Sequence, residues 1–189
     1  GEAVRALATP RARATGLRLQ ANLSGRSLED RDLGAWILEQ LRRHDVLPDR
    51  LGVEVTETVA ITELTAARDL ASTLIDAGVG FALDDFGAGF GSFIYLKHLP
   101  FDFLKIDGEF VRHLAGSHDD RVIVSSLVQV ARGLGKRTIA EYVDAPTTLE
   151  LLRTLGVEAH GITCDLRDRD QVRAMVAEAV DRLGAGHLG

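Results

Sequence analysis

Apolar residues follow two alternating periods along the chain. Short, nearly continuous apolar runs are typical of buried strands, and the longer stretches between them repeat an apolar residue every three or four positions, as one helix face does. Because strand-like runs alternate with such stretches, the pattern predicts parallel strands joined by helical crossovers. The predicted strands are residues 17–23, 51–55, 79–83, 101–106 and 137–140, and the predicted helices are residues 32–44, 64–77, 119–134 and 146–155.

Glycines mark the ends of three predicted helices. Gly78, Gly135 and Gly156 each follow a helical stretch, at a position where the left-handed cap of a helix favours glycine. A strand-like run begins shortly after each of them. The glycines therefore support the same alternation of helices and strands.

Polar side chains lie where each predicted strand ends. In a parallel barrel the carboxyl ends of the strands meet at one face, and the loops there build the active site. Charged residues also gather at strand ends because loops are solvated, but their recurrence after every strand favours a common site. The residues in these positions are Asn22, Glu54, Glu57, Asp84, Asp85, Lys105, Asp107, Glu141 and Asp144.

Most of these side chains offer oxygen atoms as metal ligands. With no cysteine cluster and no suitably spaced histidines, they favour a hard cation such as Mg²⁺ or Mn²⁺ over zinc. Adjacent carboxylates such as Asp84 and Asp85 repel each other unless a cation or a proton lies between them. Metal ions held in this way can activate a water molecule and neutralise a phosphodiester. Lys105 could hold or deprotonate that water, or stabilise charge as a cation.

A glycine-rich segment, residues 87–92, follows the two aspartates. It lacks the G-x-G-x-x-G spacing of a dinucleotide-binding turn. It is therefore either a plain flexible turn or a mobile loop beside the site that can move the aspartates.

The composition excludes several classes of protein. The 189 residues are 46% apolar, carry a net charge of −6 and show no long run of Lys or Arg, which argues against a nucleic-acid polymer as partner. The single cysteine, Cys164, excludes an intrachain disulfide. No apolar run approaches the ~20 residues of a membrane span, and the N-terminus does not resemble a signal peptide. We expect a cytoplasmic location, with any membrane anchor in a preceding region.

Five short motifs resemble those of the EAL domain family, the cyclic-di-GMP phosphodiesterases. They follow the family's order and stay in register from about residue 17 to residue 161, which makes the resemblance highly specific. The motifs are ANLS at residues 21–24, EVTE at 54–57, DDFGAG at 84–89, LKID at 104–107 and IAEYVD at 139–144.

The resemblance implies a (β/α)8 TIM-type barrel that hydrolyses cyclic di-GMP to pGpG with Mg²⁺ or Mn²⁺. Lys105 resembles the lysine that contacts the catalytic water, and Glu57 the glutamate that anchors the glycine-rich loop. That loop couples to dimerisation in the family, so the resemblance also implies a homodimer through the loop after Asp85. Catalytic roles are implied for Lys105 and Glu141, and metal binding for Asn22, Glu54, Asp84, Asp85 and Glu141.

Several positions depart from the family's pattern. The Glu-Ala-Leu motif and the arginine after it lie on a first strand that precedes the point where this chain begins, so we expect an incomplete barrel that lacks one metal ligand. Tyr142 replaces a glycine and Asp144 a glutamate near the metal site. His160 stands where a glutamine touches the nucleotide, which makes it a candidate substrate-binding residue.

We divide the chain into a partial EAL-type barrel, residues 1–161, and an atypical strand–helix tail, residues 162–189. The tail lacks the Gly-Arg-Pro signature of the family's last strand and resembles a strand–helix unit of a short-chain dehydrogenase. It carries neither a nucleotide-binding glycine motif nor a Tyr-x-x-x-Lys pair. It is either a helix packed on the exterior of the barrel or a recombination or frameshift scar.

Three functions remain open from the sequence. The retained strand-end residues indicate an active phosphodiesterase. The missing first strand and His160 indicate an inactive EAL-type module that binds cyclic di-GMP or a protein partner, and they shift the expectation for this chain towards little or no catalysis. An oxidoreductase rests on the tail alone and is the weakest of the three.

Overall fold

The centre of the fold is a parallel sheet whose strands pair in chain order. The computed structural model describes residues 1–87, 93–155, 170, 171 and 174. In this part of the chain a five-stranded sheet has the order β1-β2-β3-β4-β5, and every pair is parallel. This order is that of a (β/α) barrel and confirms the predicted alternation. The strands are β1 Leu19–Asn22, β2 Leu51–Thr56, β3 Gly80–Phe86, β4 Phe103–Ile106 and β5 Arg137–Ala140.

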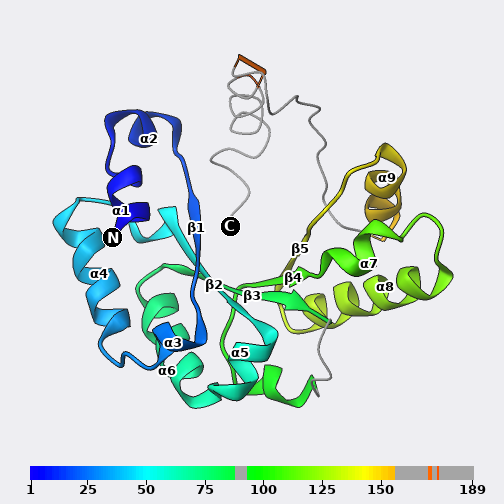
Figure 1. Cartoon of the computed structure of the whole chain (residues 1–189), viewed down its shortest axis with the longest axis horizontal. Coiled ribbons are helices and arrows are strands. Elements are labelled where there is room, and N and C mark those ends of the chain that lie inside the picture. Colours follow the sequence, from blue (N-terminus) through cyan, green and yellow to red (C-terminus); the bar gives the residue numbers. More distant parts are fainter. Residues whose placement is uncertain (88–92, 156–169, 172–173, 175–189) are drawn as a thin grey trace.

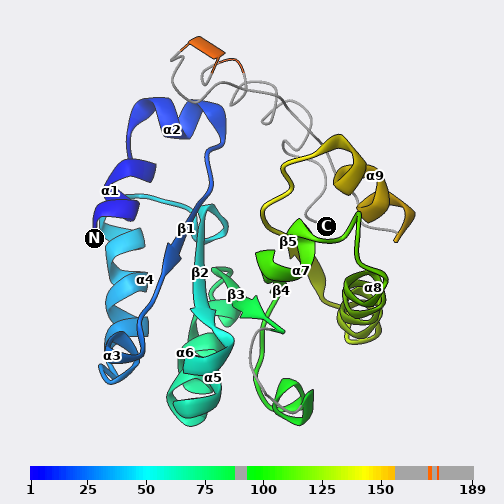
Figure 2. The same cartoon turned by 45° about the vertical axis from the view of Figure 1, so that its right-hand side comes forward.

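Helices α4, α6 and α8 lie outside the fan of strands. Each joins two neighbouring strands, and Figures 1 and 2 show the three helices following one another in an arc around the sheet. The sheet is therefore curved in the sense of a barrel wall and is covered on its outer side. The helices are α1 Glu2–Leu7, α2 Pro10–Thr15, α3 Gly25–Leu28, α4 Leu33–Arg43, α5 Glu57–Thr62, α6 Leu64–Asp76, α7 Gly108–Arg112, α8 His118–Gly133 and α9 Pro146–Thr154, with 3₁₀ turns η1 Pro48–Arg50 and η2 Phe93–Lys97.

The core forms between these helices and the outward side of the strands. The amphipathic faces of the helices meet a nearly continuous apolar sheet surface, as buried parallel strands require. Full burial of one such leucine contributes about 1.5–3 kcal/mol. Fully or almost fully buried side chains include Leu41 of α4, Leu74 of α6, Val124 of α8, and Val55, Phe81, Leu83, Leu104 and Ile106 of the sheet.

The structure confirms two predicted glycine caps and adds two N-terminal helices that the sequence pattern did not predict. Gly78 and Gly135 adopt positive φ angles of 89° and 69°, which confirms two of the three predicted caps, whereas Gly156 lies outside the described residues. Helices α1 and α2 were not predicted. Thr9 caps α2 by accepting a hydrogen bond from the backbone N–H of Ala12.

Some predicted features lie outside the part of the chain that the structure describes. They include His160, the glycine-rich residues 88–92 and most of the tail, so the loop-mediated dimer and the division at residue 161 stay predictions. None of the helices that are described combines the length and the apolar character needed to cross a bilayer.

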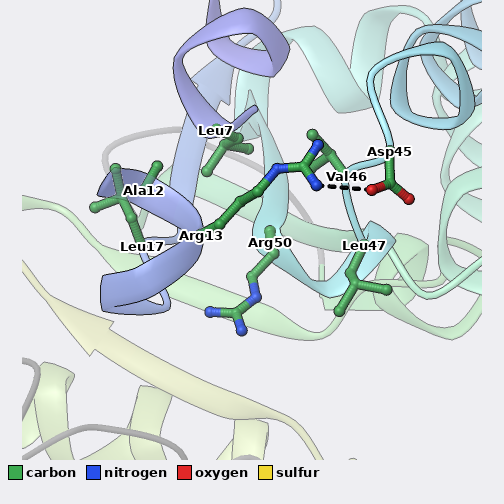
Figure 3. A pocket seen from close by; sticks show the side chains of 8 residues that line it. All are labelled: Leu7, Ala12, Arg13, Leu17, Asp45, Val46, Leu47 and Arg50. Atoms are coloured by element: carbon green, nitrogen blue, oxygen red, sulfur yellow. Dashed lines mark hydrogen bonds and ion pairs between the residues drawn. The ribbon is translucent and has the colours of Figure 1, made fainter. Parts of the chain in front are cut away.

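A small cavity lies at the amino end of the sheet, between α2 and the segment that joins α4 to β2. Its volume is about 270 Å³. Arg13 reaches across it to Asp45, with 2.7 Å between Nη1 and Oδ2 (Figure 3). This end of the sheet is opposite the polar strand ends. The cavity is lined by Leu7, Ala12, Arg13, Leu17, Asp45, Val46, Leu47 and Arg50.

Candidate active site

Lys105 is the centre of a cluster of charged side chains at the carboxyl ends of the strands. Its side chain is only 9% exposed, and its Nζ lies 2.7 Å from Glu54 Oε2, 2.8 Å from Asp84 Oδ1 and 2.8 Å from Glu141 Oε1. The four residues come from β4, β2, β3 and the segment directly after β5. Because neighbouring parallel strands end at the same edge, residues far apart in the sequence converge there.

The charge of Lys105 is held by its partners. Burial disfavours the ammonium form, but hydrogen bonds to Asp84, Glu141 and Glu54 outweigh it and raise the pKa of Lys105 above its ordinary value. In this arrangement Lys105 is a cation whose N–H groups are directed at three carboxylates. The roles predicted for Lys105 towards water and developing negative charge remain predictions.

Asp85 brings a further carboxylate to the cluster. One carboxylate oxygen from each of Asp84, Asp85 and Glu141 lies within 4.8 Å of the other two. Partial burial raises the pKa of Asp85, and the negative charges of Asp84, Asp107 and Glu141 add to this shift. Glu54, Asp84 and Glu141 share the single ammonium of Lys105, and Asp85 lies beside two of them, so the cluster carries an excess of negative charge.

A bulge in β3 explains how two adjacent aspartates reach one site. Neighbouring residues of a regular strand point to opposite faces. Here Leu83 pairs with Leu104 and Phe86 with Ile106, so β3 takes three steps where β4 takes two. Asp85 has a positive φ of 52°, and its N–H donates to Asp84 Oδ1 at 3.0 Å. The extra residue re-aims the strand, and both side chains contribute to the same cluster.

Glu57 connects the end of β2 to the segment after β3. It is buried, and its carboxylate accepts hydrogen bonds from the N–H of Gly87 and the hydroxyl of Tyr95, each at 3.0 Å. Burial and the neighbouring carboxylate raise the pKa of Tyr95 well above its ordinary value. The contact with Gly87 agrees with an anchoring role for Glu57. Sequence reasoning missed Tyr95 because no strand-end pattern singles it out.

Asn22 lies at the same edge but outside the ion pairs. It is the last residue of β1, directly opposite Glu54 in the register of β1 and β2, and it is exposed. The structure therefore brings Glu54, Asp84, Asp85, Lys105 and Glu141 together and leaves Asn22 at the margin.

The residues of the cluster fit a divalent cation. Every acidic member offers oxygen ligands, which suit hard cations. Glu54, Asp84 and Glu141 together have only the Lys105 ammonium as a cationic partner within the cluster, and Asp85 adds a fourth carboxylate. An excess of negative charge among adjacent carboxylates is the feature that a bound cation would satisfy.

Comparisons with known proteins identify the family of the chain. The EAL domain matches residues 2–160 of the chain. The chain is 39% identical over 139 residues to the cyclic di-GMP phosphodiesterase PdeB of Shewanella oneidensis, an alignment that covers 74% of this chain and 16% of PdeB.

Solved structures are similar as well. The PaMucR phosphodiesterase in complex with c-di-GMP has a TM-score of 0.74 and 34% identity, over 82% of this chain and 64% of that one. A manganese and cyclic di-GMP complex of Klebsiella pneumoniae BlrP1 has a TM-score of 0.70 and 32% identity, over 82% and 41%. The chain thus spans less than two thirds of each of these relatives. Because the family match extends over residues 2–160 and includes every residue of the Lys105 cluster, the chain belongs to the EAL domain family.

Proposed function

We propose that this chain hydrolyses cyclic di-GMP to linear pGpG with Mg²⁺ or Mn²⁺. The observation that carries the proposal is the cluster of four carboxylates around Lys105 at the carboxyl ends of parallel strands. Such a cluster suits a cation and, through it, the phosphate groups of an anionic substrate. Proteins similar to this chain include the cyclic di-GMP phosphodiesterase PdeB and the PaMucR phosphodiesterase in complex with c-di-GMP.

In this proposal the carboxylates bind the cation, and Lys105 positions the carboxylates. Asp84, Asp85 and Glu141, with Glu54 beside them, would hold the cation, and Asn22 lies at the margin where it could join them. A bound divalent cation would lower the pKa of a water molecule and neutralise the phosphodiester. Lys105 donates hydrogen bonds to the carboxylates and so fixes their relative positions.

Lys105 also has a role towards the reacting groups. Hydrolysis forms one bond from water oxygen to phosphorus and breaks one ester bond, and negative charge accumulates on the phosphate oxygens as this happens. A buried ammonium that keeps its proton stabilises such charge as a cation while its N–H groups remain directed at the three carboxylates. The raised pKa of Lys105 supports this role.

The direct test is hydrolysis by the purified chain. We expect pGpG, detected by chromatography, when cyclic di-GMP and Mn²⁺ are supplied, and we expect Asp84→Asn to remove the activity. Arg18→Ala is the matched control, because Arg18 forms an exposed ion pair with Asp49 at the other end of the sheet. Binding of cyclic di-GMP without pGpG would indicate the inactive EAL-type module instead. A folded chain that does neither would overturn the proposal.

A further inference from the structure

Tyr142 is an exposed aromatic residue in a strained backbone position directly beside the site. Its side chain is largely in contact with solvent, at 58% exposed. Its φ angle is 55°, in the left-handed region that side chains rarely adopt. The preceding residue, Glu141, is a member of the Lys105 cluster. A strained residue in such a position persists only where its surroundings hold it.

Two residues of α7 hold the ring of Tyr142. A methyl group on Gly108 would lie 2.0 Å from Tyr142 Cδ2, so the ring rests directly on the glycine backbone. The guanidinium carbon of Arg112 lies 3.8 Å from the ring centroid, which is a cation–π contact. The ring therefore joins the segment after β5 to the first turn of α7.

This contact acts where the sheet no longer fixes the chain. The register of β4 and β5 ends with the pair Ile106 and Ala140, so Glu141 lies one residue beyond the last paired position. On the other side, α7 begins two residues after Ile106, which follows Lys105 directly. The ring of Tyr142 thus connects the chain carrying Glu141 to the chain carrying Lys105, where ladder hydrogen bonds have ended.

We propose that Tyr142 is a positioning residue. Its ring, held by Gly108 and Arg112, fixes the carboxylate of Glu141 against Lys105 and the cation-binding aspartates. The consequence for catalysis rests on the proposed function, but the positioning itself does not. The role requires the ring and not the hydroxyl, because the ring makes the contacts with Gly108 and Arg112.

The first arm of the test needs neither metal nor substrate. Hydrogen–deuterium exchange of the full chain is measured for the peptide that covers residues 137–145. We expect faster exchange in Tyr142→Ala and Arg112→Ala, and parent-like exchange in Tyr142→Phe. Arg137→Ala is the matched control, because it removes another guanidinium–aromatic contact, 4.3 Å over Phe103, at the opposite end of β5.

The second arm measures Mn²⁺ affinity by calorimetry and the kinetics of cyclic di-GMP hydrolysis. We expect Tyr142→Ala to bind Mn²⁺ about tenfold more weakly, the lower end of the loss caused by removing a residue that orients metal ligands. Arg112→Ala should weaken it about threefold, as loss of an exposed cation–π contact would. Tyr142→Phe and Arg137→Ala should stay within about twofold of the parent chain.

Tyr142→Gly separates the ring from the backbone strain. Glycine adopts a positive φ freely, so this variant keeps the turn and removes the contact. Losses like those of Tyr142→Ala support the proposal, whereas parent-like exchange and Mn²⁺ affinity in Tyr142→Gly and Tyr142→Ala overturn it. If the parent chain binds no Mn²⁺ or hydrolyses nothing, the proposed function fails, and the exchange arm still decides whether the ring positions Glu141.

Discussion

The two ends of the sheet handle charge in different ways. At the amino end, ion pairs lie in exposed positions and carboxylates are not in excess within them: Asp45 pairs with Arg13 at 2.7 Å, and Asp49 pairs with Arg18 at 3.2 Å and with Arg50 at 3.8 Å. At the carboxyl end, three carboxylates share the ammonium of the buried Lys105, and Asp85 adds a fourth carboxylate beside them. Exposed pairs contribute little to stability and are easily replaced. An excess of partly buried carboxylates lowers the stability of the fold. The excess at the carboxyl end of the sheet therefore indicates a site that serves binding.

Backbone strain occurs at both ends of the sheet. Asp85 and Tyr142 adopt positive φ angles within the carboxyl-end cluster or directly beside it. At the amino end, the turns before β3 and β5 place glycine at a positive φ, at Gly78 and Gly135, whereas Asp45 before β2 adopts a φ of 52° without being glycine. Glycine adopts this conformation without a steric penalty, and other residues do so at a cost that the surroundings must offset.

The largest effect should come from Lys105→Met. Hydrolysis should fall by at least about 10²-fold, as for a residue that stabilises the transition state. The substitution also leaves three carboxylates without their cationic partner, which should lower the free energy of unfolding by about 3 kcal/mol at pH 7. Urea denaturation measures this loss. Added Mn²⁺ should restore part of the lost stability.

The stabilisation that Lys105 contributes to the folded chain should depend on pH. Because folding raises the pKa of Lys105, its contribution is fully present below the unfolded value of about 10.4 and is lost as pH rises through the folded value. The difference in free energy of unfolding between parent and Lys105→Met should therefore narrow in alkaline solution. Lys97→Met, at an exposed lysine, is the control. Equal stability of parent and Lys105→Met at pH 7 would contradict the ion-pair cluster.

The second largest effect should come from Glu57→Ala. The substitution leaves the buried hydroxyl of Tyr95 and the N–H of Gly87 without their acceptor. Each unsatisfied group costs about 1–3 kcal/mol, so we expect a loss near 3 kcal/mol in thermal or urea unfolding. Tyr95→Phe removes one partner and should cost only about 1 kcal/mol. If both variants unfold like the parent, Glu57 is not an anchor.

Asp85→Asn should separate stability from binding. Because folding raises the pKa of Asp85, its ionisation opposes folding, and this cost disappears as pH falls below the unfolded value of about 3.9. The variant should have a higher Tm than the parent at pH 7, with the difference shrinking towards pH 4. The gain should stay below about 1 kcal/mol because Asp85 is exposed to solvent. The same variant should bind Mn²⁺ more weakly than the parent. A Tm below that of the parent at pH 7 would contradict the prediction.

The smallest effect should come from Arg18→Ala at the amino end. The ion pair with Asp49 is exposed on both sides, so its loss should change the free energy of unfolding by about 0.5 kcal/mol or less. Hydrolysis should remain at the level of the parent chain. A loss of activity here would show that the two ends of the sheet are not independent.

The sequence predicted most of the elements but not all of their limits. The long helices α4, α6, α8 and α9 and strand β5 lie within a residue of the predicted ranges, because their apolar periodicity is strong. Helices α1 and α2 were missed, since an Ala- and Arg-rich segment shows little periodicity. Strand β3 was expected to end at the two aspartates, but it pairs with β4 through Phe86.

The sequence by itself determined which residue types stand at the ends of the parallel strands, and from that the oxygen-rich chemistry of the site. This conclusion follows from the apolar periodicity and from the order of the predicted strands and helices along the chain. Only the tertiary structure decided that a bulge turns Asp84 and Asp85 to one site, that Lys105 joins three carboxylates, and that Tyr142 rests on Gly108. These facts depend on the curvature of the sheet and on contacts between segments far apart in sequence, which no local pattern encodes.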